Sequence, residues 1–352
     1  MVVHNSPPFS ATGYVGGSLL VSLVQKYPLT KITALVRNPE DLDAVSAVGP
    51  TVHVVLGSHT DREVIIRAVS DAELVVQISY SDDLELVKAI VVGLKLHKEK
   101  TGKRALYFHA TGTMTYAGEA SGELRKDYEV WDDRDKNRLR KKVDINAPHR
   151  RIDLEAIRAH DQNVADVYVI CPPVVYGLGT GPVRRINGQI THAVRIFLEM
   201  NHAVYVGKGT NIWSHIHIRD LIQAILTIID HAIRTQNDTP EGDQTAERDG
   251  FDNFYFTSAG EHTWGSVIEE IARTMFQRGL LKCPSLESVS EEYNRILSWN
   301  VGSNCRVRSA RLEALGWRPK ETSIIDNIEE CVEASLQLIK SDRVLNFWLG
   351  DY

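Results

Sequence analysis

Apolar and polar positions in the first half of the chain follow two alternating patterns. Continuous apolar runs rich in Val, Ile and Tyr predict buried strands at 31–37, 52–57, 72–79, 104–111 and 165–173. Amphipathic stretches between these runs predict helices at 17–27, 62–70, 83–100 and 149–162. Strands that are apolar on both faces and alternate with helices are typical of a parallel sheet covered on both sides. The pattern therefore predicts an α/β fold with a doubly wound parallel sheet.

The second half has shorter elements and one long polar stretch. Helices are predicted at 191–201, 220–233, 264–279 and 323–340. The polar residues 234–250 contain almost no apolar anchor, which predicts a surface loop. We expect one domain over 1–180 and a smaller one over 181–352, some segments of which return to the sheet.

Composition and charge exclude several classes of protein. The chain has 352 residues, 43% of them hydrophobic, so it can bury a large core. Its net charge of −6 argues against nucleic acid or an anionic membrane as the main partner. No apolar stretch is long enough to span a bilayer, and Pro7 and Pro8 interrupt any secretory signal, so a cytoplasmic location is expected.

No metal site is predicted. The four cysteines are widely scattered, which is typical of reduced thiols in an intracellular protein. His215 and His217 point the same way on one predicted strand, but only Asp220 lies near them as a third ligand.

A glycine-rich loop precedes the first predicted helix. Gly13 and Gly16 lie where a dinucleotide loop needs a tight turn and close approach to a diphosphate, and Gly17 would allow close helix–strand packing. The N–H groups that open the helix would then face the phosphates. Two features depart from this pattern. Ser10 stands at the usual first glycine, and the prolines before it are poorly tolerated in a central strand, so no regular strand is expected to end at the loop.

Arg37 bears on the choice between the two nicotinamide cofactors. It ends the second predicted strand, about twenty residues after the loop, where an acidic residue binds the ribose of NAD and an arginine accommodates the 2′-phosphate of NADP. The sequence therefore favours NADP, with NAD as the alternative.

Several motifs, in this order, resemble the extended short-chain dehydrogenase/reductases of the NAD-dependent epimerase/dehydratase type. They are ATGYVGGSLL, ALVRNPE, VVLGSHTD, VICPPVVYGLG, VGKGTNIWSHIHIRDL and SNCRVRSARLEALGWRPK. The resemblance implies a cofactor in contact with Ser10, Thr12, Gly13, Tyr14, Val15, Gly16, Arg37, Ser58, His59, Ser79 and Pro173. It also implies a Rossmann-type, dinucleotide-binding domain over 1–180 and a mainly substrate-binding domain over 181–352. The implied partner is a small-molecule substrate, with a homodimer as an open alternative.

The catalytic residues of that family are changed here. Its reductive members use Tyr-x-x-x-Lys on the helix before the sixth strand, but this chain has His149 and Asp153 at those positions. His149 could transfer a proton near neutral pH, with charge from Arg150 or Arg151, and Tyr128 is a second candidate.

The family also uses a hydroxyl after the fifth strand to polarise the substrate carbonyl. Thr111 and Thr113 offer that group. We therefore expect an oxidoreductase acting on an aldehyde, ketone or sugar-like alcohol. The alternative is a non-catalytic dinucleotide sensor or pseudoenzyme of the same fold.

Overall fold

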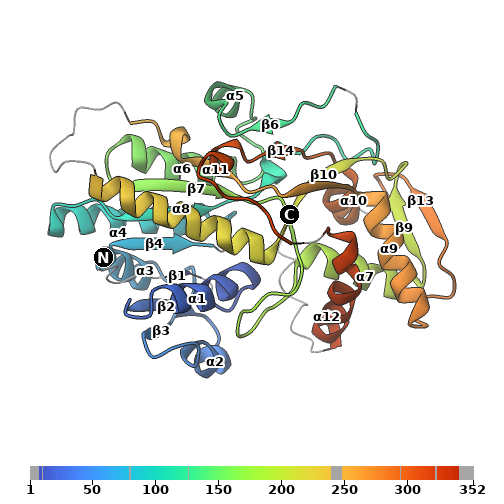
Figure 1. Cartoon of the computed structure of the whole chain (residues 1–352), viewed down its shortest axis with the longest axis horizontal. Coiled ribbons are helices and arrows are strands. Elements are labelled where there is room, and N and C mark those ends of the chain that lie inside the picture. The colour runs from blue at the N-terminus through green and yellow to red at the C-terminus, as the bar shows by residue number, and fades with distance from the viewer. Residues whose placement is uncertain are drawn as a thin grey trace.

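The computed structural model of the chain describes residues 8–9, 11–78, 81–125, 127–238, 248–293, 295–321 and 323–340. Its larger part is built on one sheet, and a smaller group of helices and short strands adjoins it (Figure 1). None of the helices within these ranges is long and apolar enough to cross a membrane.

The large sheet has seven strands, and every pair of neighbours is parallel. Their spatial order is β11 (Phe254–Phe256), β7 (Asp166–Cys171), β5 (Leu106–Ala110), β4 (Leu74–Gln77), β1 (Pro8–Phe9), β2 (Ile32–Val36) and β3 (Val52–Leu56). The strand order reverses between β1 and β4. Ligands of such sheets bind at this switch point, beyond the carboxyl ends of the strands. The predicted Rossmann-type fold is confirmed.

The central strand β1 is present but very short. Pro8 lies opposite Val76 of β4, and Phe9 lies opposite Leu35 of β2. The sequence predicts no regular strand here, and β1 has only two residues; Pro7 lies outside the described residues. Pro8 is accommodated because it is the first residue of the strand, where a proline is tolerated.

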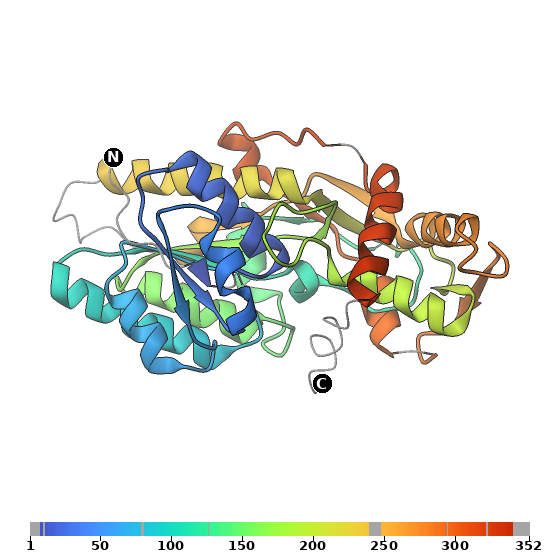
Figure 2. The ribbon, with the colours of Figure 1, turned by 90° about the horizontal axis from the view of Figure 1, so that it is seen from below.

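Helices cover both faces of the sheet (Figure 2). On one face, α1 (Tyr14–Lys26) and α8 (Ile218–Asp238) share a buried core with Ile32, Ala34 and Val36. On the other face lie α3 (Arg62–Ser70), α4 (Leu84–Thr101) and α6 (Arg150–Asp161). Alternate residues of each strand point to opposite faces, which is why these continuously apolar strands supply both cores.

The smaller part contains two further sheets and four helices. One sheet is formed by β12 (Gly260–Thr263), β10 (Ile212–His217) and β8 (Val174–Tyr176), and the other by β13 (Leu286–Val289) and β9 (Ala203–Val206). The helices are α7 (Gly188–Met200), α9 (Trp264–Gln277), α10 (Arg295–Gly302) and α12 (Ile328–Lys340). The remaining short elements are α2 (Leu42–Ser46), η1 (Pro39–Asp41), η2 (Thr113–Tyr116), η3 (Gly250–Asn253), η4 (Ile325–Asn327), β6 (Trp131–Asp132), α5 (Lys136–Lys141), β14 (Val307–Arg308) and α11 (Ala310–Ala314).

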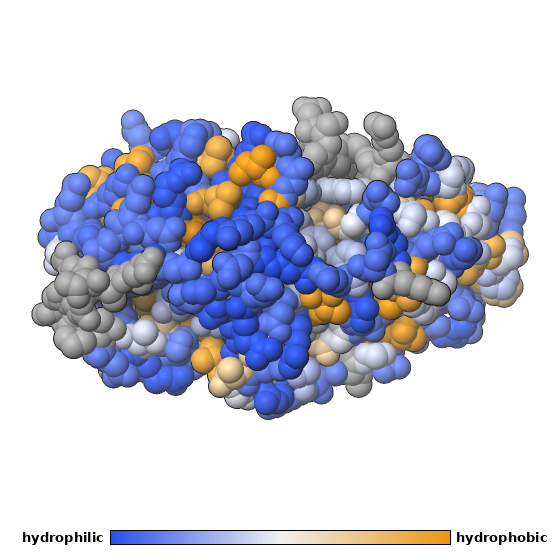
Figure 3. Space-filling model, turned by 90° about the horizontal axis from the view of Figure 1, so that it is seen from above, coloured by the Kyte–Doolittle hydropathy of each residue, from blue (hydrophilic) through white to orange (hydrophobic). Residues whose placement is uncertain are grey.

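A highly charged segment at 118–148 contains α5 and β6, which lie at the top of Figure 1. Seen from above, the surface of the molecule is mainly hydrophilic, with apolar residues in small separate groups (Figure 3). Several basic side chains of this segment are paired with acids: Lys136 and Arg140 contact Asp249, and Arg134 contacts Asp132. These pairs offset the positive charge of the segment.

Candidate functional site

The glycine loop leads into helix α1 at the carboxyl edge of the sheet, beside the switch point. Gly13 precedes the helix in an extended conformation, and Gly17 N–H makes a bond of 2.8 Å back to Gly13 O. The N–H groups of the first helical residues have no acceptor within the helix. Such a helix start accepts a phosphate or diphosphate group, so Gly13, Tyr14, Val15 and Gly16 fit a dinucleotide.

A second glycine-rich segment, residues 177–184, packs directly on this loop. We call it the strap. Tyr14 OH donates to Gly177 O at 2.7 Å, Arg184 N–H donates to Thr12 O at 3.1 Å, and Thr180 N–H donates to the Ser18 hydroxyl at 3.1 Å. The strap follows β8, so the loop is supported by a part of the chain far away in sequence.

Gly17 is where the two segments come closest. A Cβ atom there would lie 2.9 Å from Ala11 O and 3.1 Å from the Cα of Gly181. We expect Gly17→Ala to force the two backbones apart, lowering the free energy of unfolding by about 1–3 kcal/mol and weakening dinucleotide binding. Thermal unfolding and quenching of protein fluorescence by NADPH would measure both effects. Gln25→Ala on the exposed side of α1 is the control, and equal behaviour of the two variants would contradict the close contact.

The other residues predicted to bind the cofactor lie at the carboxyl ends of strands. Arg37 directly follows β2 and is exposed. Ser58 and His59 follow β3, and His59 Nε2 lies 3.6 Å from Asp83 in front of α4. Pro173 is buried just beyond β7. The two predicted residues Ser10 and Ser79 lie outside the described residues.

Thr111 belongs to a buried hydrogen-bonded network at the end of β5. Its hydroxyl donates to Asp153 Oδ2 at 3.0 Å, and His109 Nε2 lies 3.0 Å from Asp153 Oδ1. Tyr107 OH completes the network, 3.1 Å from His109 Nδ1. Asp153 is only 1% exposed. The proton of Thr111 is therefore directed at Asp153 and away from any substrate.

Thr113 lies one turn further on, in η2. Its side chain is buried, and its hydroxyl has no hydrogen-bond partner among the described residues. Its backbone N–H donates to Pro172 O at 3.1 Å. Of the two predicted threonines, Thr113 is therefore the one whose hydroxyl makes no hydrogen bond within the described residues.

His149 precedes α6 and lies beside Gly112, in the loop between β5 and η2. Its Nδ1 lies 2.6 Å from Asp82 Oδ1, and its Nε2 would be 3.3 Å from a Cβ added at Gly112. Its φ of 63° is in the left-handed region, which is uncommon outside glycine and clusters at functional sites. Burial opposes the charged imidazolium, but the hydrogen bond and charge of Asp82, together with Asp153, raise the pKa of His149 above its usual value.

The groups around His149 differ from those expected. Arg150 donates to Arg140 O at 3.0 Å, and Arg151 donates to Asn146 Oδ1 at 2.5 Å. The side-chain partner of His149 is the Asp82 carboxylate, and the charges that raise its pKa are those of Asp82 and Asp153.

Tyr128, the second acid/base candidate, is also committed elsewhere. Its hydroxyl donates to Tyr116 O at 2.6 Å, and burial raises its pKa above the usual range. It is therefore a poor proton donor or acceptor compared with His149.

The histidines considered as metal ligands pack within the smaller part. His215 Nδ1 lies 3.1 Å from His262 Nδ1, and the two rings stack. Burial lowers the pKa of His215 to about 4, which keeps its ring neutral. Across the described ranges, no three His, Cys, Asp or Glu side chains are grouped so as to hold a metal ion.

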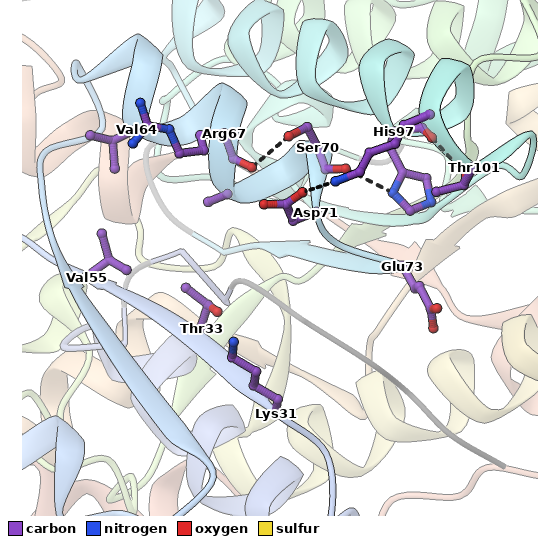
Figure 4. A pocket seen from close by; sticks show the side chains of 12 residues that line it. Lys31, Thr33, Val55, Val64, Arg67, Ser70, Asp71, Glu73, His97 and Thr101 are labelled. Carbon is purple, nitrogen blue, oxygen red and sulfur yellow. Dashed lines mark hydrogen bonds and ion pairs between the residues drawn. The ribbon is translucent and has the colours of Figure 1, made fainter.

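A cavity of about 570 Å³ lies at the opposite edge of the sheet (Figure 4). It lies between the start of β2, marked by Lys31 and Thr33, and α3 with Arg67. Glu73, just before β4, also lines it. These residues lie at the amino ends of the strands, whereas the glycine loop and His149 lie at the carboxyl ends. The cavity is separate from the candidate site.

Comparisons with known proteins agree with this fold. Residues 147–239 match the model of the NAD dependent epimerase/dehydratase family. The chain is 26% identical over 340 residues to Oxidase ucsJ of an Acremonium species, covering 92% of this chain and 95% of that protein.

Two solved structures share the arrangement over nearly the whole chain. One is dTDP-glucose 4,6-dehydratase DesIV from Streptomyces venezuelae with NAD and TYD bound, at 17% identity, a TM-score of 0.63, and coverage of 95% of this chain and 97% of that one. The other is UDP-glucuronic acid 4-epimerase from Bacillus cereus with UDP-glucuronic acid and NAD, at 12% identity, a TM-score of 0.59, and coverage of 95% and 99%. The resemblance of this chain to the NAD-dependent epimerase/dehydratase family, expected from its motifs, is thereby confirmed, with the fold of an extended short-chain dehydrogenase/reductase.

Proposed function

We propose that the chain is an NAD(P)-dependent oxidoreductase that interconverts a carbonyl and an alcohol on a small substrate and prefers NADP. A bound nicotinamide cofactor would supply or accept the hydride. The chain would bind its diphosphate at Gly13–Gly16 and move a proton at His149. The observation that carries the proposal is the place of His149: its Nε2 lies over Gly112 at the carboxyl edge, two strands along the sheet from the strand that feeds the glycine loop.

The relatives support the class of reaction. The dehydratase and epimerase structures hold NAD, and their names describe changes at sugar hydroxyl groups. The curated relative is named an oxidase. A small carbonyl or sugar-like alcohol is therefore the substrate class we propose, bound between the carboxyl edge and the smaller part of the molecule.

The proposal is tested by binding first and turnover second. Binding should quench the fluorescence of NADPH or of the protein, and NADPH should raise the melting temperature of the protein. A panel of aldehydes, ketones and keto-sugars with NADPH or NADH should then show consumption of the cofactor. Absence of binding by both cofactors at high micromolar concentration would overturn the proposal.

We expect Arg37 to decide between the two cofactors. Arg37→Asp removes a positive charge that would pair with the 2′-phosphate and places an acidic group where the ribose 2′-hydroxyl of NAD would lie. A hydrogen bond to a charged group contributes about 1.5–3 kcal/mol, so affinity for NADPH should fall about tenfold to a hundredfold while that for NADH is kept or improved. Titration with each cofactor measures this.

The matched control for Arg37 is Arg62→Gln. Arg62 is another exposed arginine, at the start of α3, and it forms an ion pair with Glu85. Equal losses of NADPH and NADH affinity in Arg37→Asp would mean that Arg37 supports the loop generally and does not read the 2′-phosphate.

A second candidate function is a dinucleotide sensor without turnover. It is favoured by the buried Asp153, which occupies the position of the family's lysine and bonds His109 and Thr111. Measurable cofactor affinity with no turnover of any carbonyl, and no difference between wild type and His149→Ala, would support the sensor.

A further inference from the structure

Asp82 and His149 meet across the candidate site from two separate loops. Asp82 lies between β4 and α4, and His149 lies at the start of α6. The Oδ1 of Asp82 is 2.6 Å from Nδ1 of His149, and the His149 side chain is only 12% exposed whereas that of Asp82 is 49% exposed. The contact therefore joins a half-exposed carboxylate to a nearly buried imidazole.

The backbone around His149 is fixed as well. The Thr115 hydroxyl lies 2.8 Å from Pro148 O and 3.0 Å from Gly112 O. This side chain ties the residue before His149 to the loop that His149 covers. Such ties can hold a residue in the left-handed region, a conformation that costs about 1–3 kcal/mol when nothing supports it.

The contact determines which ring nitrogen faces the loop. Nδ1–H donates to Asp82, so a neutral imidazole carries its proton on Nδ1 and exposes the lone pair of Nε2. Nε2 is the atom nearest to Gly112, where a side chain of any size would meet it. Because Gly112 has no Cβ, no side chain of that residue crowds Nε2.

We propose that Asp82 is a positioning residue that fixes the orientation and tautomer of His149, so that Nε2 is the atom that exchanges a proton with the substrate oxygen. This inference rests on the proposed oxidoreductase function. In the reducing direction, the substrate carbon gains a hydride from the reduced nicotinamide, its oxygen takes the proton from Nε2, and His149 becomes neutral. Solvent then returns a proton to Nε2. In the oxidising direction, neutral Nε2 accepts the alcohol proton as the hydride leaves.

The charges facing His149 are mainly negative. Asp82 faces it from the loop before α4, and Asp153 acts from the next turn of α6. The loop beneath it, at Gly112, carries no charge. The Arg150 guanidinium lies over the Phe251 ring and donates from one nitrogen to Arg140 O, and Arg151 donates to Asn146. The protonated form of His149 is favoured, so the rate of reduction should fall as the pH rises through the elevated pKa of His149.

Asp82→Asn tests this assignment in two independent ways. Two-dimensional NMR of the histidine ring protons in the cofactor-free protein should show that the pKa of His149 is lower in Asp82→Asn than in wild type. With cofactor and substrate, kcat should fall about tenfold to a hundredfold, as for partners that orient a functional histidine, with KM little changed. The alkaline limb of the pH profile for reduction should move to lower pH.

Two further variants separate positioning from a general structural effect. Asp82→Glu keeps the carboxylate and should restore the pKa and part of kcat. Glu85→Gln removes a carboxylate from the first turn of α4 that pairs only with Arg62 and Lys88, and should leave the pKa of His149 and kcat unchanged. Melting temperatures of all variants check that each is folded.

The outcomes distinguish this inference from the proposed function. An unchanged pKa of His149 in Asp82→Asn, or an equal loss of kcat in Glu85→Gln, would overturn the role of Asp82 even if the protein turns over carbonyls. A lowered pKa together with no cofactor binding would retain the Asp82–His149 pair and overturn the oxidoreductase.

Discussion

Replacing Asp153 by alanine is expected to lower the free energy of unfolding by about 3–5 kcal/mol, because it removes one partner from a buried, hydrogen-bonded charged group. His109 Nε2 and the Thr111 hydroxyl would both lose their acceptor in a region closed to water. A decrease in melting temperature on the order of 10 °C is expected for a domain of this class. Differential scanning calorimetry or chemical unfolding would measure the change.

The same site separates the network from the motif that the sequence resembles. Asp153→Lys introduces the lysine of the Tyr-x-x-x-Lys motif, yet we expect it to destabilise more than alanine, because a buried ammonium group would face His109 without a partner. Glu155→Gln on the same helix is the control, since Glu155 forms a surface pair with Arg158 that contributes at most about 1 kcal/mol. If Asp153→Lys were as stable as wild type, the network would not be required for folding.

The second large effect is expected for His149→Gln. Loss of a positioned general acid or base commonly lowers turnover by about 10²–10⁴-fold, and we expect a decrease of that size in kcat. Cofactor affinity should be retained, because His149 contacts Asp82 and Gly112 rather than the glycine loop that would bind the diphosphate. Steady-state kinetics and NADPH titration on the same protein separate the two quantities.

The control for His149 is His53→Gln, an exposed histidine of β3 away from the site. It should leave turnover and cofactor binding unchanged. If His149→Gln kept full activity, proton transfer would have to pass through another group, for which the buried Thr113 hydroxyl is a candidate.

Periodicity predicts most of the large sheet because buried parallel strands are apolar at nearly every position. It also places α3 correctly at 62–70. The start of α1 is predicted three residues late, because Gly16 and Gly17 mask the helical pattern at its first turn. The predicted loop at 234–250 is wrong at its start: α8 continues to Asp238, and Gln236 in this extension donates to Arg104 O at 2.9 Å.

The candidate site is only partly accessible to sequence reasoning. His149 is found by its position in the family motif, but its partner Asp82 lies 67 residues away and no periodic pattern connects them. The same holds for His109 and Asp153, which are 44 residues apart. One signal could have suggested Asp82: it follows a buried strand, and the carboxyl ends of parallel strands meet at one edge of the sheet.

The strap has a consequence for how the protein is made. The entrance to α1 is braced by hydrogen bonds to Gly177, Thr180 and Arg184, the first of them spanning 163 residues of sequence. During synthesis the amino-terminal third of the sheet is complete long before this brace emerges from the ribosome. Under the proposed function, binding of a dinucleotide needs this brace and therefore follows the folding of both halves of the chain against each other.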